Sequence, residues 1–187
     1  TCQEVLDSIL IAHRLAEHKN VRLPVIVNLD GFYLSFTREP VTIPDAAAVR
    51  RFLPPFDPEN IEFRASRPVS QAVAVLGGSP YSYFRYEMHL AMQQALPAYD
   101  EIAADFASAF GRSWPTVETY KMDDAEFAYF MVGAFATKAM AAVDRLRAEG
   151  WKIGLVRPRL MRPYPLEILR KLLLGKQGVA VIDQNLS

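Results

Sequence analysis

The stretch AEFAYFMVGAFATKAMAAVDRLRAEGWKIGLVRPRL, residues 125–160, decides the fold class. Its first part, 125–133, is a mostly apolar run without polar alternation, which predicts a buried strand. Residues 136–150 predict a helix that ends at a glycine, and 151–160 predict a second strand. A strand, a helix and a strand joined by short links are typical of parallel pairing with a right-handed crossover.

The same alternation continues on both sides of this stretch. Downstream, LEILRKLLL (166–174) predicts a helix and GVAVID (178–183) a third buried strand. Upstream, residues 2–19 predict an amphipathic helix, and the apolar run that ends in VIVNLD predicts a buried strand over 24–30. The chain is therefore predicted to be an α/β protein.

Two further helices are predicted between these parts. Residues 45–52 predict a short helix with Asp45 as its N-cap, and 82–111 predict a long one that is broken or kinked near Pro97. The pattern of the chain changes after this long helix, so we expect a domain boundary within 112–124.

Composition narrows the function classes. The chain has 187 residues, and 51% are hydrophobic, which is enough for a sizeable core. Lys plus Arg and Asp plus Glu both number 21, so no overall charge attracts the chain to nucleic acid or to an anionic membrane. The longest nearly apolar run, 125–136, is shorter than the roughly 20 residues of a membrane-spanning helix and contains Glu126.

Cysteine and histidine are sparse. The single cysteine, Cys2, excludes an internal disulfide and any cysteine-based zinc or iron–sulfur site, and one unpaired thiol fits a reducing cytoplasm. His13, His18 and His89 are isolated, so no metal site is assigned and no Ser-His-Asp or Cys-His set can be proposed. Predicted elements lie close to both ends of the chain, which is typical of an internal segment of a longer protein.

Two local signals have alternative interpretations. The turn at Gly133–Ala134–Phe135 could seat an anion at the helix N-terminus, but a tight turn that lets the helix pack on the sheet is the simpler explanation. Arg157, Arg159 and Arg162 could bind a phosphate or a partner's carboxylates, or could line a solvated sheet edge.

The sequence DGF follows the predicted strand 24–30 at its carboxyl end, the edge where ligands bind in open α/β sheets. A turn after a buried strand often needs a glycine with positive φ, so Gly31 is predicted to hold one. The sequence up to this point indicates no particular chemistry.

Four phrases occur in one linear order along the chain. They are TCQEVLDSILIAHRLAE with LPVIVNLDGFYLS and EPV, then FGRSWPTVETYKMDDAE, then GLVRPRLMRPYPLEIL, and last VAVIDQN. Together they resemble the α subunit of the 2-oxoacid:ferredoxin oxidoreductase (pyruvate:ferredoxin oxidoreductase) family over nearly the whole chain.

The resemblance implies two α/β domains of thiamine enzymes. Residues 1–111 would be the C-terminal part of a pyrimidine-binding-type domain, and 112–187 an incomplete transketolase C-terminal-like domain. Asp30, Gly31 and Phe32 would border the thiamine site, while the glutamate that activates the cofactor lies upstream. The chain itself is expected to contain no catalytic residue and no metal site.

The resemblance also implies a function, which is oxidative decarboxylation of a 2-oxoacid to an acyl-CoA on thiamine diphosphate with magnesium. Electrons would pass to iron–sulfur clusters on other domains or subunits, and the partners would be a diphosphate-binding β subunit, a γ subunit and an iron–sulfur subunit. Arg157, Arg159 and Arg162 would lie at an interface of this complex, and at least one of them would pair with a distant carboxylate. The alternative is a binding or assembly module without chemistry of its own.

Relatives in this family commonly have His at the position of Phe36. The apolar ring either marks a bulkier, less polar substrate or packs within the loop.

Overall fold

The structure is a computed structural model that describes residues 1–58, 62–69 and 79–183. Helices and strands are mixed along the chain, which confirms the predicted α/β class. In order, the described elements are α1 (Cys2–Ala16), α2 (Ala46–Phe52), α3 (Ser79–Phe110), β1 (Val117–Tyr120), β2 (Phe127–Met131), α4 (Ala136–Ala148), β3 (Ile153–Pro158), α5 (Leu166–Leu173) and β4 (Gly178–Ile182).

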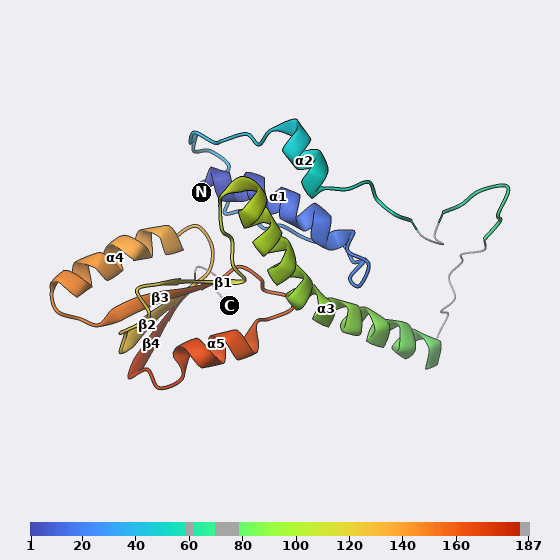
Figure 1. The fold of residues 1–187 in the computed structure, drawn as a ribbon. Coiled ribbons are helices and arrows are strands. Elements are labelled where there is room, and N and C mark those ends of the chain that lie inside the picture. Colours follow the sequence, from blue (N-terminus) through green and yellow to red (C-terminus); the bar gives the residue numbers. More distant parts are fainter. Residues whose placement is uncertain (59–61, 70–78, 184–187) are drawn as a thin grey trace.

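The four described strands form one sheet in the order β1-β3-β2-β4. β2 pairs in parallel with β3 on one side and with β4 on the other, which confirms the predicted β-α-β-α-β arrangement. β1 was not predicted, and it pairs antiparallel with β3. Figure 1 shows α4 and α5 on opposite faces of this sheet.

Successive side chains of β3 point to opposite faces of the sheet, and a helix packs against each face. Leu155 packs into a cluster with Ala139 and Val143 of α4, whereas its neighbour Val156 packs with Leu169 of α5. Successive side chains of a strand point to opposite faces, so an apolar run without polar alternation supplies two cores at once.

A helical layer adjoins the sheet. Ile11 and Leu15 of α1, Phe52 of α2 and Phe106 of α3 share one apolar cluster, in which the rings of Phe52 and Phe106 lie 5.3 Å apart. Asp45 caps α2 as predicted, because its side chain accepts a hydrogen bond from the N–H of Ala48.

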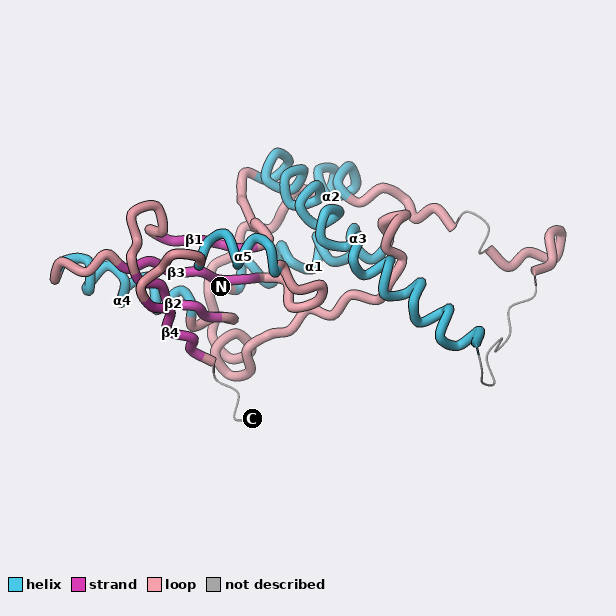
Figure 2. Tube along the Cα trace, turned by 90° about the horizontal axis from the view of Figure 1, so that it is seen from below, coloured by secondary structure: helices cyan, strands magenta, loops and turns pink. Residues whose placement is uncertain are grey.

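The long helix α3 begins far from this layer. Residues 80–90 are exposed, and Figure 2 shows this half of α3 leading away from the rest of the molecule. The helix continues through Pro97, so of the two predicted alternatives, a break or a kink, the break is absent, and the helix axis bends about midway in Figure 1.

The predicted buried strand over 24–30 is wrong. These residues form no strand, and Ile26 is 84% exposed. A strand is held by hydrogen bonds to neighbouring strands, and in the described part of the chain no strand pairs with this segment. The predicted burial of β4 is wrong for a related reason, because β4 lies at the edge of the described sheet and Val179 to Ile182 are exposed.

Candidate functional site

The loop at Asp30, Gly31 and Phe32 lies against the N-terminal end of α4. The carboxylate of Asp30 accepts a hydrogen bond from the N–H of Ala134, with an O···N distance of 2.5 Å. These two residues are 104 positions apart. The structure therefore brings together the predicted DGF turn and the predicted Gly133 turn, and the anion at this turn is a side chain of the protein itself.

Gly133 makes this approach possible. Its φ is +83°, and a Cβ at this position would lie 3.1 and 3.2 Å from the two carboxylate oxygens of Asp30. Any other residue would be strained by its backbone conformation and would also press on the carboxylate.

An aromatic contact accompanies the hydrogen bond. The ring of Tyr33 meets the ring of Phe135 edge-on, with centroids 4.5 Å apart. The Nζ atom of Lys138 lies 4.5 Å from the Tyr33 ring and 4.9 Å from the Phe135 ring, at cation–π distance. The loop thus contacts α4 through a charge, a ring pair and an ammonium group.

The loop also has internal bonds. The N–H of Phe32 donates to the hydroxyl of Ser35 at 2.9 Å, and the N–H of Phe36 donates to the carbonyl of Phe32 at 3.0 Å. The positive φ of this turn, 67°, belongs to Phe32, so the prediction for Gly31 is wrong. A Cβ placed on Gly31 would have no atom within 4 Å, so a side chain at this position would face open space.

Phe32 and Phe36, both in this loop, stack on each other on its exposed side. Their ring centroids are 5.5 Å apart with an interplanar angle of 29°, yet Phe32 is 69% exposed and Phe36 78% exposed. Beyond this mutual contact, Phe36 has little of its surface packed within the loop.

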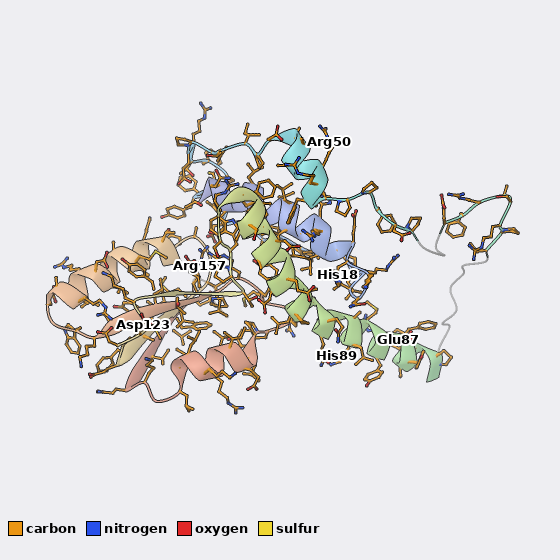
Figure 3. All side chains as sticks on the ribbon, viewed as in Figure 1. His18, Arg50, Glu87, His89, Asp123 and Arg157 are labelled. Carbon is orange, nitrogen blue, oxygen red and sulfur yellow. The ribbon has the colours of Figure 1, made fainter. Side chains whose placement is uncertain are left out.

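The arginine cluster lies where the sheet meets the helical layer, as Figure 3 shows for Arg157. Arg157 donates to Glu4 and to Glu118 at 3.0 Å each, and Arg159 donates to the same two carboxylates at 2.8 and 2.6 Å. Both arginine side chains are only 8% exposed. The expected pairing with a distant carboxylate is observed, and it occurs within the chain, whereas Arg162 is exposed.

This cluster shifts the acidity of its members. Burial raises the pKa of Glu4, but the charges and hydrogen bonds of Arg157 and Arg159 outweigh burial and hold the pKa below its ordinary value. Burial raises the pKa of the nearby Tyr99 to about 12, and its hydroxyl donates to the carbonyl of Trp114 at 3.0 Å. Glu4 and Glu118 were not predicted as partners, because a single sequence contains no signal that joins residues so far apart.

A second ion pair ties α1 to the segment after α3. Asp7 is fully buried and accepts two hydrogen bonds from the guanidinium of Arg112, at 2.6 and 2.8 Å. The indole N–H of Trp114 donates to the same carboxylate at 2.9 Å. This pair was not predicted from the sequence either.

Three donors that would suit a diphosphate are already engaged within the chain. The helix N-terminus of α4 already holds the Asp30 carboxylate, and Arg157 and Arg159 are neutralised by Glu4 and Glu118. Among residues 1–58, 62–69 and 79–183, no three His, Cys, Asp or Glu side chains gather in a way that could hold a metal ion. Two of the three histidines lie on separate elements, since His18 follows α1 and His89 lies on α3 (Figure 3).

None of the described helices combines the length and the apolar character that a membrane span requires.

Two family models match the chain in succession. Residues 1–104 match pyruvate flavodoxin/ferredoxin oxidoreductase, thiamine diphosphate-binding, and residues 125–187 match pyruvate:ferredoxin oxidoreductase core domain II. The DGF loop lies in the first matched part and Gly133 in the second, so the contact between Asp30 and Ala134 joins the two.

Curated relatives extend over nearly the whole chain. Pyruvate synthase subunit PorA is 36% identical in Pyrococcus abyssi over 99% of this chain and 47% of the relative, and 38% identical in Methanocaldococcus jannaschii over 99% and 48%. The alpha subunit of NADH-dependent phenylglyoxylate dehydrogenase from Aromatoleum evansii is 38% identical over 98% and 46%. The chain spans about half the length of these relatives. With both family models matched in order, the chain belongs to the pyruvate:ferredoxin oxidoreductase family, as its four phrases predicted.

Proposed function

We propose that this chain forms part of the α subunit of a thiamine diphosphate-dependent 2-oxoacid oxidoreductase. The reaction is the oxidative decarboxylation of a 2-oxoacid to an acyl-CoA, with electrons passed to iron–sulfur clusters on other domains or subunits. The names of the relatives support this class, because pyruvate and phenylglyoxylate are both 2-oxoacids. The observation that carries the proposal is the succession of the two matched parts, residues 1–104 and 125–187, in one chain.

The chain contributes structure to this enzyme rather than reacting groups. Thiamine diphosphate, magnesium and the clusters are bound by other parts of the enzyme, because the donors that suit a phosphate, at the α4 N-terminus and on Arg157 and Arg159, already have internal partners. Residues 1–111 serve as the end of the pyrimidine-binding-type domain and 112–187 as the transketolase C-terminal-like domain. Asp30, Gly31 and Phe32 form the loop that borders the thiamine site.

The partners of this enzyme are a diphosphate-binding β subunit, a γ subunit and an iron–sulfur subunit, in the cytoplasm. Arg157 and Arg159 are held by carboxylates of their own chain, so a subunit contact through them needs Glu4 or Glu118 to be shared. Arg162, which is exposed, is the member of the three that can meet a partner's carboxylate without breaking an internal pair.

The test is to express the protein with its partner subunits and to measure reduction of a viologen dye. We expect turnover with pyruvate or an aryl 2-oxoacid that requires coenzyme A, thiamine diphosphate and magnesium. If the subunits assemble stably but no 2-oxoacid supports dye reduction, the enzyme assignment is wrong and the role of an assembly module is favoured.

A further inference from the structure

We infer that Asp30 is a positioning residue, which holds the loop 30–36 against the N-terminal end of α4 and so fixes the direction in which Phe32 and Phe36 face. This inference rests on the proposed function for its link to turnover, but the contact itself is a feature of the fold. Asp30 acts through the loop and is not assigned any contact with substrate or cofactor.

The turn that leads into α4 uses Asp30 as an acceptor for one of its backbone N–H groups. Helix N-termini leave backbone N–H groups without partners inside the helix, and a nearby side chain usually accepts one of them. At α4 no such local cap is present, since the residue at the cap position, Phe135, makes no side-chain hydrogen bond. The first N–H groups of α4, at 136–138, donate to backbone carbonyls of the preceding turn, and the N–H of Ala134 within that turn donates to the distant carboxylate of Asp30.

The space beside Gly133 is shaped for this carboxylate. Gly133 leaves free the position that a Cβ would take, at 3.1 Å from an Asp30 oxygen, and the positive end of the helix dipole favours a negative charge here. With one oxygen engaged at 2.5 Å by a backbone donor, Asp30 is placed to hold the loop rather than to transfer a proton.

The contact extends from Asp30 to the exposed rings. Tyr33 lies between Asp30 and Phe36 in the sequence, and its ring contacts both Phe135 and the ammonium of Lys138. The N–H of Phe36 donates to the carbonyl of Phe32, and this hydrogen bond closes the loop into one turn. Holding the loop through Asp30 and Tyr33 therefore fixes the exposed apolar face made by Phe32 and Phe36.

The experiment compares three variants in the assembled enzyme. Asp30→Ala removes the acceptor, Asp30→Asn keeps a neutral oxygen acceptor, and Asp45→Ala is the matched control. Asp45 also accepts a backbone N–H, at 2.9 Å from Ala48, but it caps its own helix locally and joins no distant segments. Amide hydrogen exchange is followed by mass spectrometry in peptides that cover 30–36 and 133–138, and kcat and KM are measured for the 2-oxoacid.

We expect Asp30→Ala to speed exchange in both peptides about tenfold, because the contact that closes them is lost. We also expect kcat/KM to fall about tenfold, with most of the loss recovered in Asp30→Asn and the pH profile unchanged. Asp45→Ala should leave both peptides and kcat/KM as in the wild type.

Three results would overturn the inference. Unchanged exchange in Asp30→Ala would mean that the contact does not hold the loop, and unchanged kcat/KM with faster exchange would remove the positioning role. Equal loss in the Ala and Asn variants, with a limb of the pH profile missing, would make Asp30 a proton-transfer group. Absence of turnover in the wild-type enzyme would count against the proposed function, while the exchange arm would still decide whether Asp30 holds the loop.

Discussion

At the scale of single residues, the two glycines of the site differ in what a side chain would meet. Gly133 has a φ of +83° and faces the Asp30 carboxylate, whereas Gly31 has no atom within 4 Å of its missing Cβ. Gly133→Ala should lower the free energy of unfolding by about 1–2 kcal/mol, since a left-handed backbone is strained for any L-residue with a Cβ. Gly31→Ala should change it by no more than about 0.5 kcal/mol. Urea denaturation of both variants measures this, and equal losses would contradict it.

Asp7 offers a second contrast between residues of one type. Its fully buried carboxylate is bonded to Arg112 and Trp114, whereas Asp144 pairs with Lys121 at the surface. Asp7→Ala should lower the free energy of unfolding by about 3 kcal/mol, because it leaves a mostly buried guanidinium and an indole N–H without their acceptor. Asp144→Ala should lower it by less than about 1 kcal/mol. If chemical denaturation shows similar losses for both, Asp7 is not a structural anchor.

At the scale of elements, Glu4 ties the first turn of α1 to β3, and this contact predicts a dependence of stability on pH. Because the pKa of Glu4 is lowered in the folded state, the unfolded chain binds the proton more readily. The stabilisation is therefore present above the ordinary pKa of 4.5 and is lost as the pH falls through the folded pKa.

The measurement is the urea midpoint of the wild type and of Glu4→Gln between neutral pH and acid. Glu4→Gln should be less stable at neutral pH and should lose less stability on acidification, since it has no proton to bind. Glu17→Gln, at an exposed position just after the same helix, is the control and should follow the wild type. If the urea midpoints of the wild type and of Glu4→Gln fall equally as the pH decreases, this ion pair does not set the stability in acid.

Sequence periodicity predicted most elements, because each is determined by its own residues. The alternation from 125 to 183 appears as β2, α4, β3, α5 and β4, and the helices at 2–19 and 45–52 are present with ends shifted by a few residues. β1 was missed because four residues, VETY, carry no periodic apolar signal and its pairing with β3 is a tertiary contact. The segment 24–30 has the apolar pattern of a strand, but its backbone needs a neighbour that the described chain does not supply.

Only part of the candidate site was predicted, because its turns are local features whereas its contacts are tertiary. The DGF turn and the Gly133 turn were both recognised as local features, but their contact spans 104 residues and depends on packing. Likewise, Arg157 and Arg159 were recognised, whereas their partners Glu4 and Glu118 became visible only in the fold. Local patterns locate charged groups, and only the tertiary structure shows which charges neutralise which.

At the scale of the whole molecule, three carboxylates of the first 30 residues bind donors in the part after α3. Glu4 binds Arg157 and Arg159, Asp7 binds Arg112, and Asp30 binds the N–H of Ala134. Each contact pairs an acceptor from the N-terminal part with a donor from the later part, so these hydrogen bonds hold the two parts in one arrangement. Arg157, Arg159 and the N–H of Ala134, which could otherwise bind a phosphate-bearing ligand, are used for this purpose.

Because these donors already have partners within the chain, we can predict how the 187-residue chain behaves on its own. We expect that it neither binds thiamine diphosphate with magnesium at micromolar concentration nor decarboxylates a 2-oxoacid. A diphosphate would meet the Asp30 carboxylate at the α4 N-terminus and two arginines already neutralised by Glu4 and Glu118, and the described residues provide no metal site. Titration calorimetry of the isolated chain tests this, with the assembled enzyme as the positive control. Binding with a micromolar Kd to the chain alone would show that it holds the cofactor itself, and the proposed division of roles between this chain and the rest of the enzyme would then be wrong.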